Sequence, residues 1–76
     1  MPISIAEMTR DELFAYKLRL HHKHRDYRYD ARLANDPHLI HKYNMLCEQV
    51  EHSLRAVYDE LTRREADTRL INIALH

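Results

Sequence analysis

Glycine is absent from this chain of 76 residues, and proline occurs only twice. Tight turns, hairpins and backbone positions with positive φ ordinarily use these two residues. We therefore do not expect a β-sheet. The absence of glycine also excludes the P-loop and the dinucleotide-binding fingerprint, because both need glycine where the backbone approaches a phosphate.

Disulfides, long apolar runs and an excess of one charge are also missing. Cys47 is the single cysteine, and no stretch approaches the roughly 18 apolar residues typical of a membrane helix. No basic segment followed by an apolar run opens the chain. Lys plus Arg and Asp plus Glu balance at twelve each, which argues against non-specific nucleic-acid binding as the main activity. We expect a soluble, cytoplasmic protein that does not bind membranes.

The length limits how much core the chain can bury. A single domain of this size rarely gains more than about 3–5 kcal/mol from its own core. Without a disulfide or a structural metal, association with another chain is the remaining way to bury more apolar surface. We therefore expect one domain, residues 1–76, that oligomerises.

Two signals near the N-terminus are typical of a helix start. Thr9 and Glu12 have the spacing of a capping box, in which each side chain bonds the other residue's backbone amide. Ser4 and Glu7 repeat this spacing five residues earlier. We predict a first helix over about residues 9–35, with or without one short turn before it.

The next boundary lies at Asn35-Asp36-Pro37. Proline disfavours a helical conformation of the residue before it and suits the first position of a helix, with Asp36 as its N-cap. A turn over residues 35–37 and a second helix over about 37–75 follow. Because the link is so short, the two helices should be antiparallel neighbours.

The second helix carries the strongest periodic pattern in the sequence. Apolar residues alternate at spacings of three and four, which is the a/d seam of a coiled coil. The seam residues are Ile40, Tyr43, Cys47, Val50, Leu54, Val57 and Leu61. Arg64 and Thr68 interrupt the seam, and Ile71 and Leu75 resume it in phase. This phase predicts one helix of roughly 39 residues, about 58 Å long.

The first helix has a broader and more polar stripe. Its members are Leu13, Tyr16, Leu20, His24, Tyr27, Ala31 and Ala34. Pairing outward from the turn matches residue 9 with about residue 64, so residues 70–75 should project beyond the first helix. The apolar residues Ile3, Ile5 and Met8 can fold back over part of this segment, and a second chain can cover the rest.

These patterns predict an all-α fold, an antiparallel two-helix hairpin that assembles into a homodimeric or larger helical bundle. The predicted interface residues are Val50, Leu54, Val57, Leu61, Ile71 and Leu75. Basic residues dominate positions 17–32 and acidic residues dominate positions 48–60. We expect these stretches to meet across the hairpin, although each exposed pair contributes only about 0–1 kcal/mol.

Basic and aromatic residues are expected on the outer face of the first helix. They are His22, Arg25, Arg28, Tyr29 and Arg32. Arginine suits carboxylate or phosphate, and tyrosine can stack on a base. The alternative is a solvated face whose arginine stems cover apolar surface, assisted by Asp26 and Asp30.

Metal binding and catalysis find little support. His21 with His24, and His38 with His41, have the spacing of helical metal ligands, but roughly 12–16 Å separates the two pairs along a hairpin. We expect neither a metal nor a cofactor, and we place His24 at the edge of the core. Cys47 is expected to be an inert core residue. No nucleophile with a base and an orienting group emerges, so we do not expect an enzyme.

The capped first helix, the turn containing Asn35-Asp36-Pro37 and the longer second helix resemble, in plan, the small two-helix proteins of the large ribosomal subunit. Those proteins are strongly basic and this chain is neutral, so the resemblance is limited to the outline. Our functional hypothesis is a small non-enzymatic regulator, adaptor or inhibitor that binds itself and another protein through helix faces. The alternative is an anion-binding module that holds a nucleotide or nucleic acid on the basic outer face.

Overall fold

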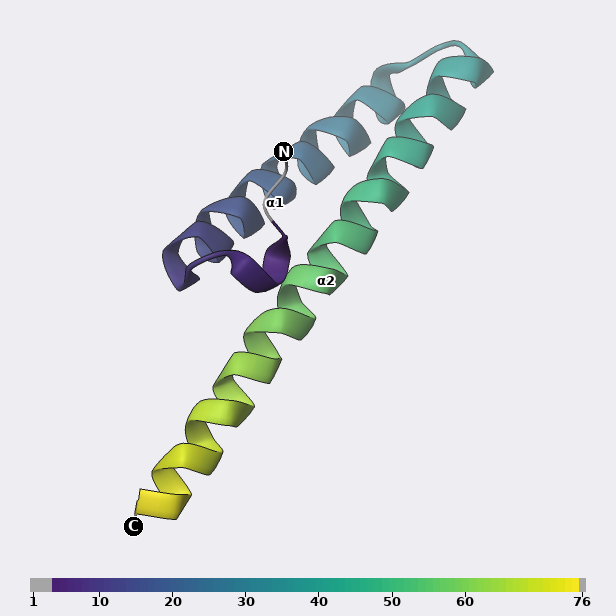
Figure 1. Cartoon of the computed structure of the whole chain (residues 1–76). Helices are drawn as coiled ribbons and strands as arrows, with labels where there is room; N and C mark the ends of the chain where they lie inside the picture. Colours follow the sequence, from purple (N-terminus) through teal and green to yellow (C-terminus); the bar gives the residue numbers. More distant parts are fainter. Residues whose placement is uncertain (1–3, 76) are drawn as a thin grey trace.

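The chain forms a helical hairpin (Figure 1). The computed structural model describes the backbone of residues 4–75 and the side chains of residues 4–66. A short 3-10 helix, η1 (Ile5–Glu7), precedes two α-helices, α1 (Arg10–Leu33) and α2 (Pro37–Leu75). The two α-helices pack against each other, which confirms the predicted all-helical hairpin.

The capping box at the start of α1 is present. Thr9 Oγ1 accepts a hydrogen bond from the backbone N–H of Glu12, and Glu12 Oε1 accepts one from the backbone N–H of Thr9, each at 3.1 Å. Ser4 has the same spacing to Glu7 but makes no side-chain cap hydrogen bond and precedes only η1. Of the two start signals, the second therefore begins the long helix.

The link between the helices is short and is fixed by Asp36. The side-chain Oδ1 of Asp36 accepts a hydrogen bond from the backbone N–H of His38 at 2.9 Å, and its carbonyl accepts one from Ile40 at 3.0 Å. Pro37 is the first residue of α2, where its missing amide hydrogen leaves no bond unmade. The turn thus has the predicted N-cap chemistry.

The core is a narrow seam between α1 and α2. Leu13 and Leu20 of α1 pack against Val50 and Val57 of α2, and Leu13 and Val57 are fully buried. Partly buried apolar side chains pack against this cluster; they are Ile5, Met8, Tyr16, Tyr27, Leu54 and Leu61. Ile5 and Met8 come from the segment before α1, so η1 closes one end of the seam.

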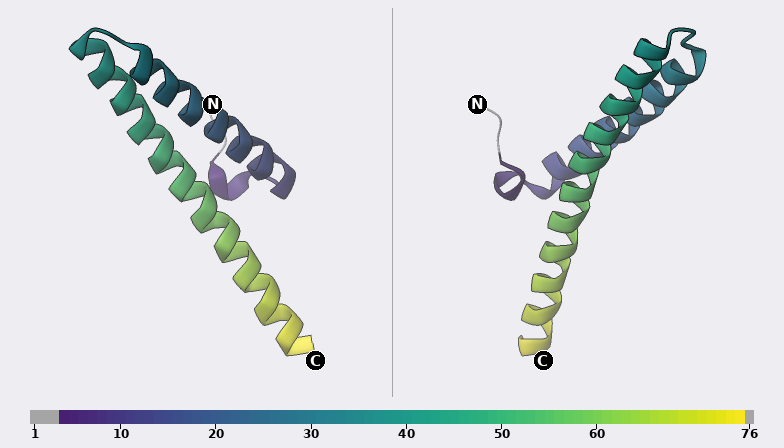
Figure 2. Two further views of the ribbon diagram at one scale, coloured as in Figure 1. Left: turned by 180° about the vertical axis from the view of Figure 1, so that it is seen from behind. Right: turned by 90° about the vertical axis from the view of Figure 1, so that its right-hand side faces the viewer.

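The molecule is long and thin, with extents of 60 × 26 × 15 Å. Figure 1 shows why: α2 continues well past the start of α1 and past η1, toward the C-terminal end of the chain. The two further views in Figure 2 agree, so the last turns of α2 lie apart from the rest of the chain. Within residues 4–75, neither α1 nor α2 has the length and apolar character needed to cross a bilayer.

Candidate binding surface

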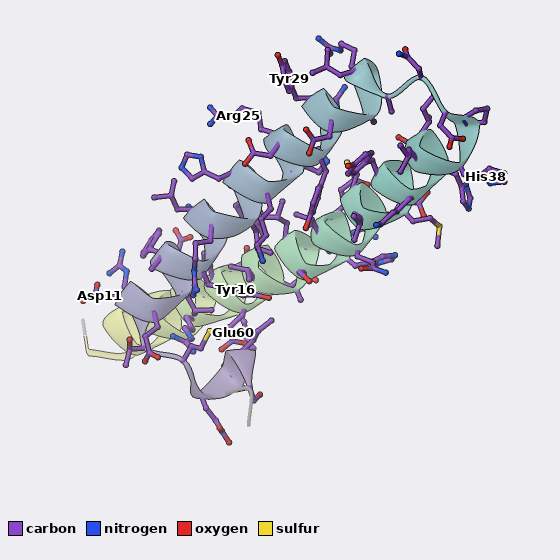
Figure 3. All side chains as sticks on the ribbon, turned by 90° about the horizontal axis from the view of Figure 1, so that it is seen from above. Asp11, Tyr16, Arg25, Tyr29, His38 and Glu60 are labelled. Carbon is purple, nitrogen blue, oxygen red and sulfur yellow. The ribbon has the colours of Figure 1, made fainter. Side chains whose placement is uncertain are left out.

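Three exposed arginines follow one another along α1. Arg25, Arg28 and Arg32, here called the basic row, are all exposed. An open hollow of about 350 Å³ runs along them, lined by His21, His24, Arg25, Arg28, Tyr29 and Arg32. In Figure 3, Arg25 and Tyr29 lie on the outer side of α1 and point away from α2. We call this hollow the α1 groove.

Four of the five predicted outer-face residues line the α1 groove. The fifth, His22, lies beside it, with its Nδ1 3.4 Å from Arg25 Nη2. His21 and His24 also line the groove, although the sequence did not assign them to it. His21 lies four residues before Arg25, and His24 lies four residues before Arg28, so each histidine shares a side of the helix with an arginine of the basic row.

The inner edge of the groove is tied to α2 by two side-chain hydrogen bonds. His24 Nε2 lies 2.9 Å from Glu51 Oε1, and His21 Nε2 lies 2.8 Å from the Tyr58 hydroxyl. The rings of His21 and Tyr58 meet edge to face, with centroids 6.0 Å apart. His24 is half-buried, which matches its expected place at the edge of the core. The two histidines therefore fix the groove relative to the second helix.

The basic and acidic stretches meet across the hairpin, where His21 contacts Tyr58 and His24 contacts Glu51, but they form few ion pairs. Between the described side chains of residues 17–32 and 48–60, one ion pair forms, His24 with Glu51. Asp26 and Asp30 pair with no arginine of the basic row. The reason is angular: at 100° per residue, these aspartates lie on the opposite side of α1 from Arg28. The arginines of the basic row therefore face solvent.

Aromatic rings and cations continue the groove toward the start of α1. Lys17 Nζ lies 4.7 Å from the centroid of the Phe14 ring and 5.6 Å from that of Tyr58. The guanidinium carbon of Arg10 also lies over the Phe14 ring, 5.5 Å from its centroid. Phe14 and Tyr58 are 41% and 45% exposed, so both rings remain available to a ligand.

A second polar cluster, outside the groove, holds η1 onto α2. Arg64 Nη2 donates hydrogen bonds to the carbonyl oxygens of Met8, Ala6 and Ile5 at 2.7, 3.3 and 3.4 Å. Its Nε donates to Glu60 Oε1 at 2.8 Å. The sequence could not predict what Arg64 bonds at its position in the seam. Its partners are main-chain carbonyl groups, which every residue has, so no residue type identifies them.

Glu60 is the anionic centre of that cluster. Arg63 donates to both of its carboxylate oxygens, at 3.1 and 2.6 Å. The hydrogen bonds from Arg63 and Arg64 lower the pKa of Glu60 from 4.5 to about 2. The carboxylate thus stays charged at all ordinary pH values and keeps Arg64 oriented toward η1.

The residues predicted for an oligomer interface have different surroundings. Val50 and Val57 are buried within one chain, and Leu54 and Leu61 pack against the same cluster. A second chain therefore reaches the two valines only if α1 moves away. The side chains of Ile71 and Leu75 lie outside the described residues, and the assignment of all six to an interface stays a prediction.

Cys47 is buried, and the histidines of the second pair are exposed. Burial raises the pKa of the Cys47 thiol, with a further increase from Glu51 nearby, and a thiol in this state is a weak nucleophile. His38 and His41 lie at the start of α2 and are exposed. Among residues 4–66, no three histidine, cysteine, aspartate or glutamate side chains are placed to share a metal ion.

Comparisons of the chain with protein-family models, with curated proteins and with solved structures give no match. The arrangement of the residues themselves is therefore the basis of the functional proposals below.

Proposed function

We propose that the chain is a self-associating protein-interaction module without catalytic chemistry of its own. The observation that supports this proposal is the extension of α2 beyond α1 and η1 (Figures 1 and 2). Nothing in the described part of the chain lies alongside these last turns. A helix in this position needs a partner, because helices in proteins are held mostly by burial of an apolar face.

The sequence of the projecting turns is apolar enough to need cover. Residues 70–75 read Leu-Ile-Asn-Ile-Ala-Leu, and Ile71 and Leu75 continue the a/d seam of α2 in phase. The core inside the hairpin is small: among residues 4–66, the buried apolar side chains are Leu13, Leu20, Cys47, Val50 and Val57. The projecting seam would add burial that one chain cannot supply.

A second copy of the same chain is the partner that fits best. Each copy offers one projecting helix, and a two-fold axis perpendicular to α2 pairs the two segments antiparallel and buries both at once. The continuing a/d phase favours helix-on-helix packing of this kind. The product is a homodimer joined through the ends of α2, with the two hairpins at opposite ends.

Apolar side chains that are exposed near the turn suit contact with another protein. They are Leu33, Leu39, Ile40 and Met45. They belong to the end of the hairpin opposite the projecting turns, so the dimer leaves them accessible. A module that dimerises at one end and binds a protein at the other is an adaptor in design.

The test is the molar mass in solution, measured by light scattering after size-exclusion chromatography. We expect a dimer for the natural chain and a monomer for Ile71→Asp, because the substitution places a charge in the proposed seam. Ala66→Asp is the matched control, since Ala66 is exposed one turn earlier and lies off the seam. A monomeric natural chain, or equal masses for the two variants, would contradict the proposal.

A further inference from the structure

The basic row has an unfavourable arrangement if it serves only as a solvated helix face. Arg28 follows Arg25 by three residues and precedes Arg32 by four, and like charges at these spacings repel on a helix. Every other residue three or four positions from these arginines within α1 is histidine, tyrosine or alanine. The sequence thus lacks an acidic neighbour at each position where one would stabilise the helix.

Tertiary structure does not neutralise the row either. None of the ion pairs formed by the described side chains involves Arg25, Arg28 or Arg32. The nearby acid of α2, Glu51, is instead bonded to His24. In a chain of zero net charge, three adjacent arginines without a carboxylate partner indicate that an anion from outside completes the surface.

The charged surface is long and contains aromatic rings. Phe14, Lys17, His21, Arg25, Arg28 and Arg32 follow one another at spacings of three or four, so they share one side of α1. This stripe is roughly 27 Å long at 1.5 Å per residue. Tyr29, which is 60% exposed, lies in the groove, and Phe14 and Tyr58 are exposed at the other end.

We propose that this side of α1 binds single-stranded nucleic acid. The arginines of the basic row hold successive phosphates, and an unstacked base lies on the ring of Tyr29. Cations combined with exposed aromatic rings are the usual means of binding single strands without reading sequence. An acidic peptide would satisfy the arginines but would leave the rings without a planar partner, and a single nucleotide would occupy only part of the stripe.

Binding can be measured by fluorescence anisotropy with a labelled single-stranded RNA of about 15 nucleotides. The test variant is Arg28→Gln with Arg32→Gln. The control is Arg19→Gln with Lys23→Gln, which removes the same charge from the other side of α1, where Arg19 lies beside Tyr16 and Lys23 lines a separate groove. Circular dichroism checks the fold, and the test variant should melt no lower than the natural chain because it relieves repulsion.

We expect the test variant to bind at least about tenfold more weakly. The slope of the logarithm of the binding constant against the logarithm of the salt concentration should become shallower by about 1.4, which is roughly 0.7 for each lost phosphate contact. The control variant should bind within about twofold of the natural chain. Its two cations make no contact in the proposed site, so their removal weakens only the general attraction between the protein and the nucleic acid. Tyr29→Leu should weaken binding and Tyr29→Phe should restore it, since only the ring is needed for stacking.

The proposal fails if the natural chain shows no binding at about 100 µM protein in low salt, the weak limit of non-specific association. It also fails if both double variants lose affinity equally, which would indicate general charge attraction. Equal affinity for poly-glutamate, together with no effect of Tyr29→Leu, would assign the surface to an acidic protein instead. If a free nucleotide binds more tightly than the single-stranded RNA, the surface is a site for one nucleotide and the proposal is wrong.

Discussion

At the scale of single residues, Arg64 shows how a polar side chain can serve a seam position. A coiled coil places an apolar residue there, yet this arginine bonds the carbonyl oxygens of Ile5, Ala6 and Met8. Carbonyl groups at the end of a short helix mostly lack partners within that helix, and of these three only the Ile5 carbonyl has one, the backbone N–H of Met8. Arg64 supplies the missing donors from α2, so it joins segments 56 to 59 residues apart in the sequence.

Replacing Arg64 with methionine should detach η1 from α2 while keeping a long apolar side chain. We expect the free energy of unfolding to fall by about 1–2 kcal/mol, the usual effect of losing charged hydrogen bonds at a partly exposed site. Hydrogen exchange at the amides of Glu7 and Met8 should become faster, because their turn is no longer held. Urea unfolding and amide exchange measure the two effects.

The neighbouring arginine provides the control. Arg63 bonds Glu60 and is 58% exposed, so Arg63→Met removes the same charge without releasing the carbonyls. Exchange in η1 should stay slow in this variant. Equal exchange rates in the two variants would mean that Arg64 does not hold η1.

Residue spacing predicted which side chains share a face, and much less about what they contact. The positions of Arg25, Arg28, Tyr29 and Arg32 follow from the helical repeat alone, and the structure places all four in one groove. The bonds from His21 to Tyr58 and from Arg64 to η1 depend on how closely two elements approach. Local sequence does not determine that distance, so these contacts could not be predicted.

At the scale of elements, the helix ends follow from local chemistry. The chain has no glycine, and Pro37 is the first residue of α2, so neither residue type interrupts this helix over its 39 residues. The start of α1 depends on Thr9, whose capping box satisfies two backbone amides at once. Signals of this kind involve residues three apart, which is why sequence alone predicts them well.

Thr9→Ala should remove the hydroxyl that caps α1. We expect the free energy of unfolding to fall by about 1 kcal/mol, the typical cost of losing such a cap. Ser4→Ala is the matched control, because Ser4 makes no side-chain cap bond and its loss should have little effect. Thermal unfolding followed by circular dichroism compares them, and an equal loss of stability in both variants would contradict the assignment of Thr9 as the effective cap.

At the scale of the whole molecule, a long, thin shape combines with a small core. The hairpin is 15 Å across its thinnest dimension. Among the described side chains, its buried centre consists of two from α1 and two from α2, with Cys47 beside them. Such a core leaves little stability to spare. If the projecting turns of α2 pair between two copies, folding and association become one equilibrium, as in obligate dimers.

The melting temperature should then rise with protein concentration. Each tenfold increase favours the dimer by about 1.4 kcal/mol, which corresponds to roughly 3–6 °C for a dimer of this size. Ile71→Asp should melt at one temperature across the whole range, and Ala66→Asp should keep the dependence of the natural chain. Circular dichroism melting curves over two decades of concentration measure this. If the natural chain melts at a constant temperature, the hairpin is stable on its own, and its projecting helix is held by something other than a second copy.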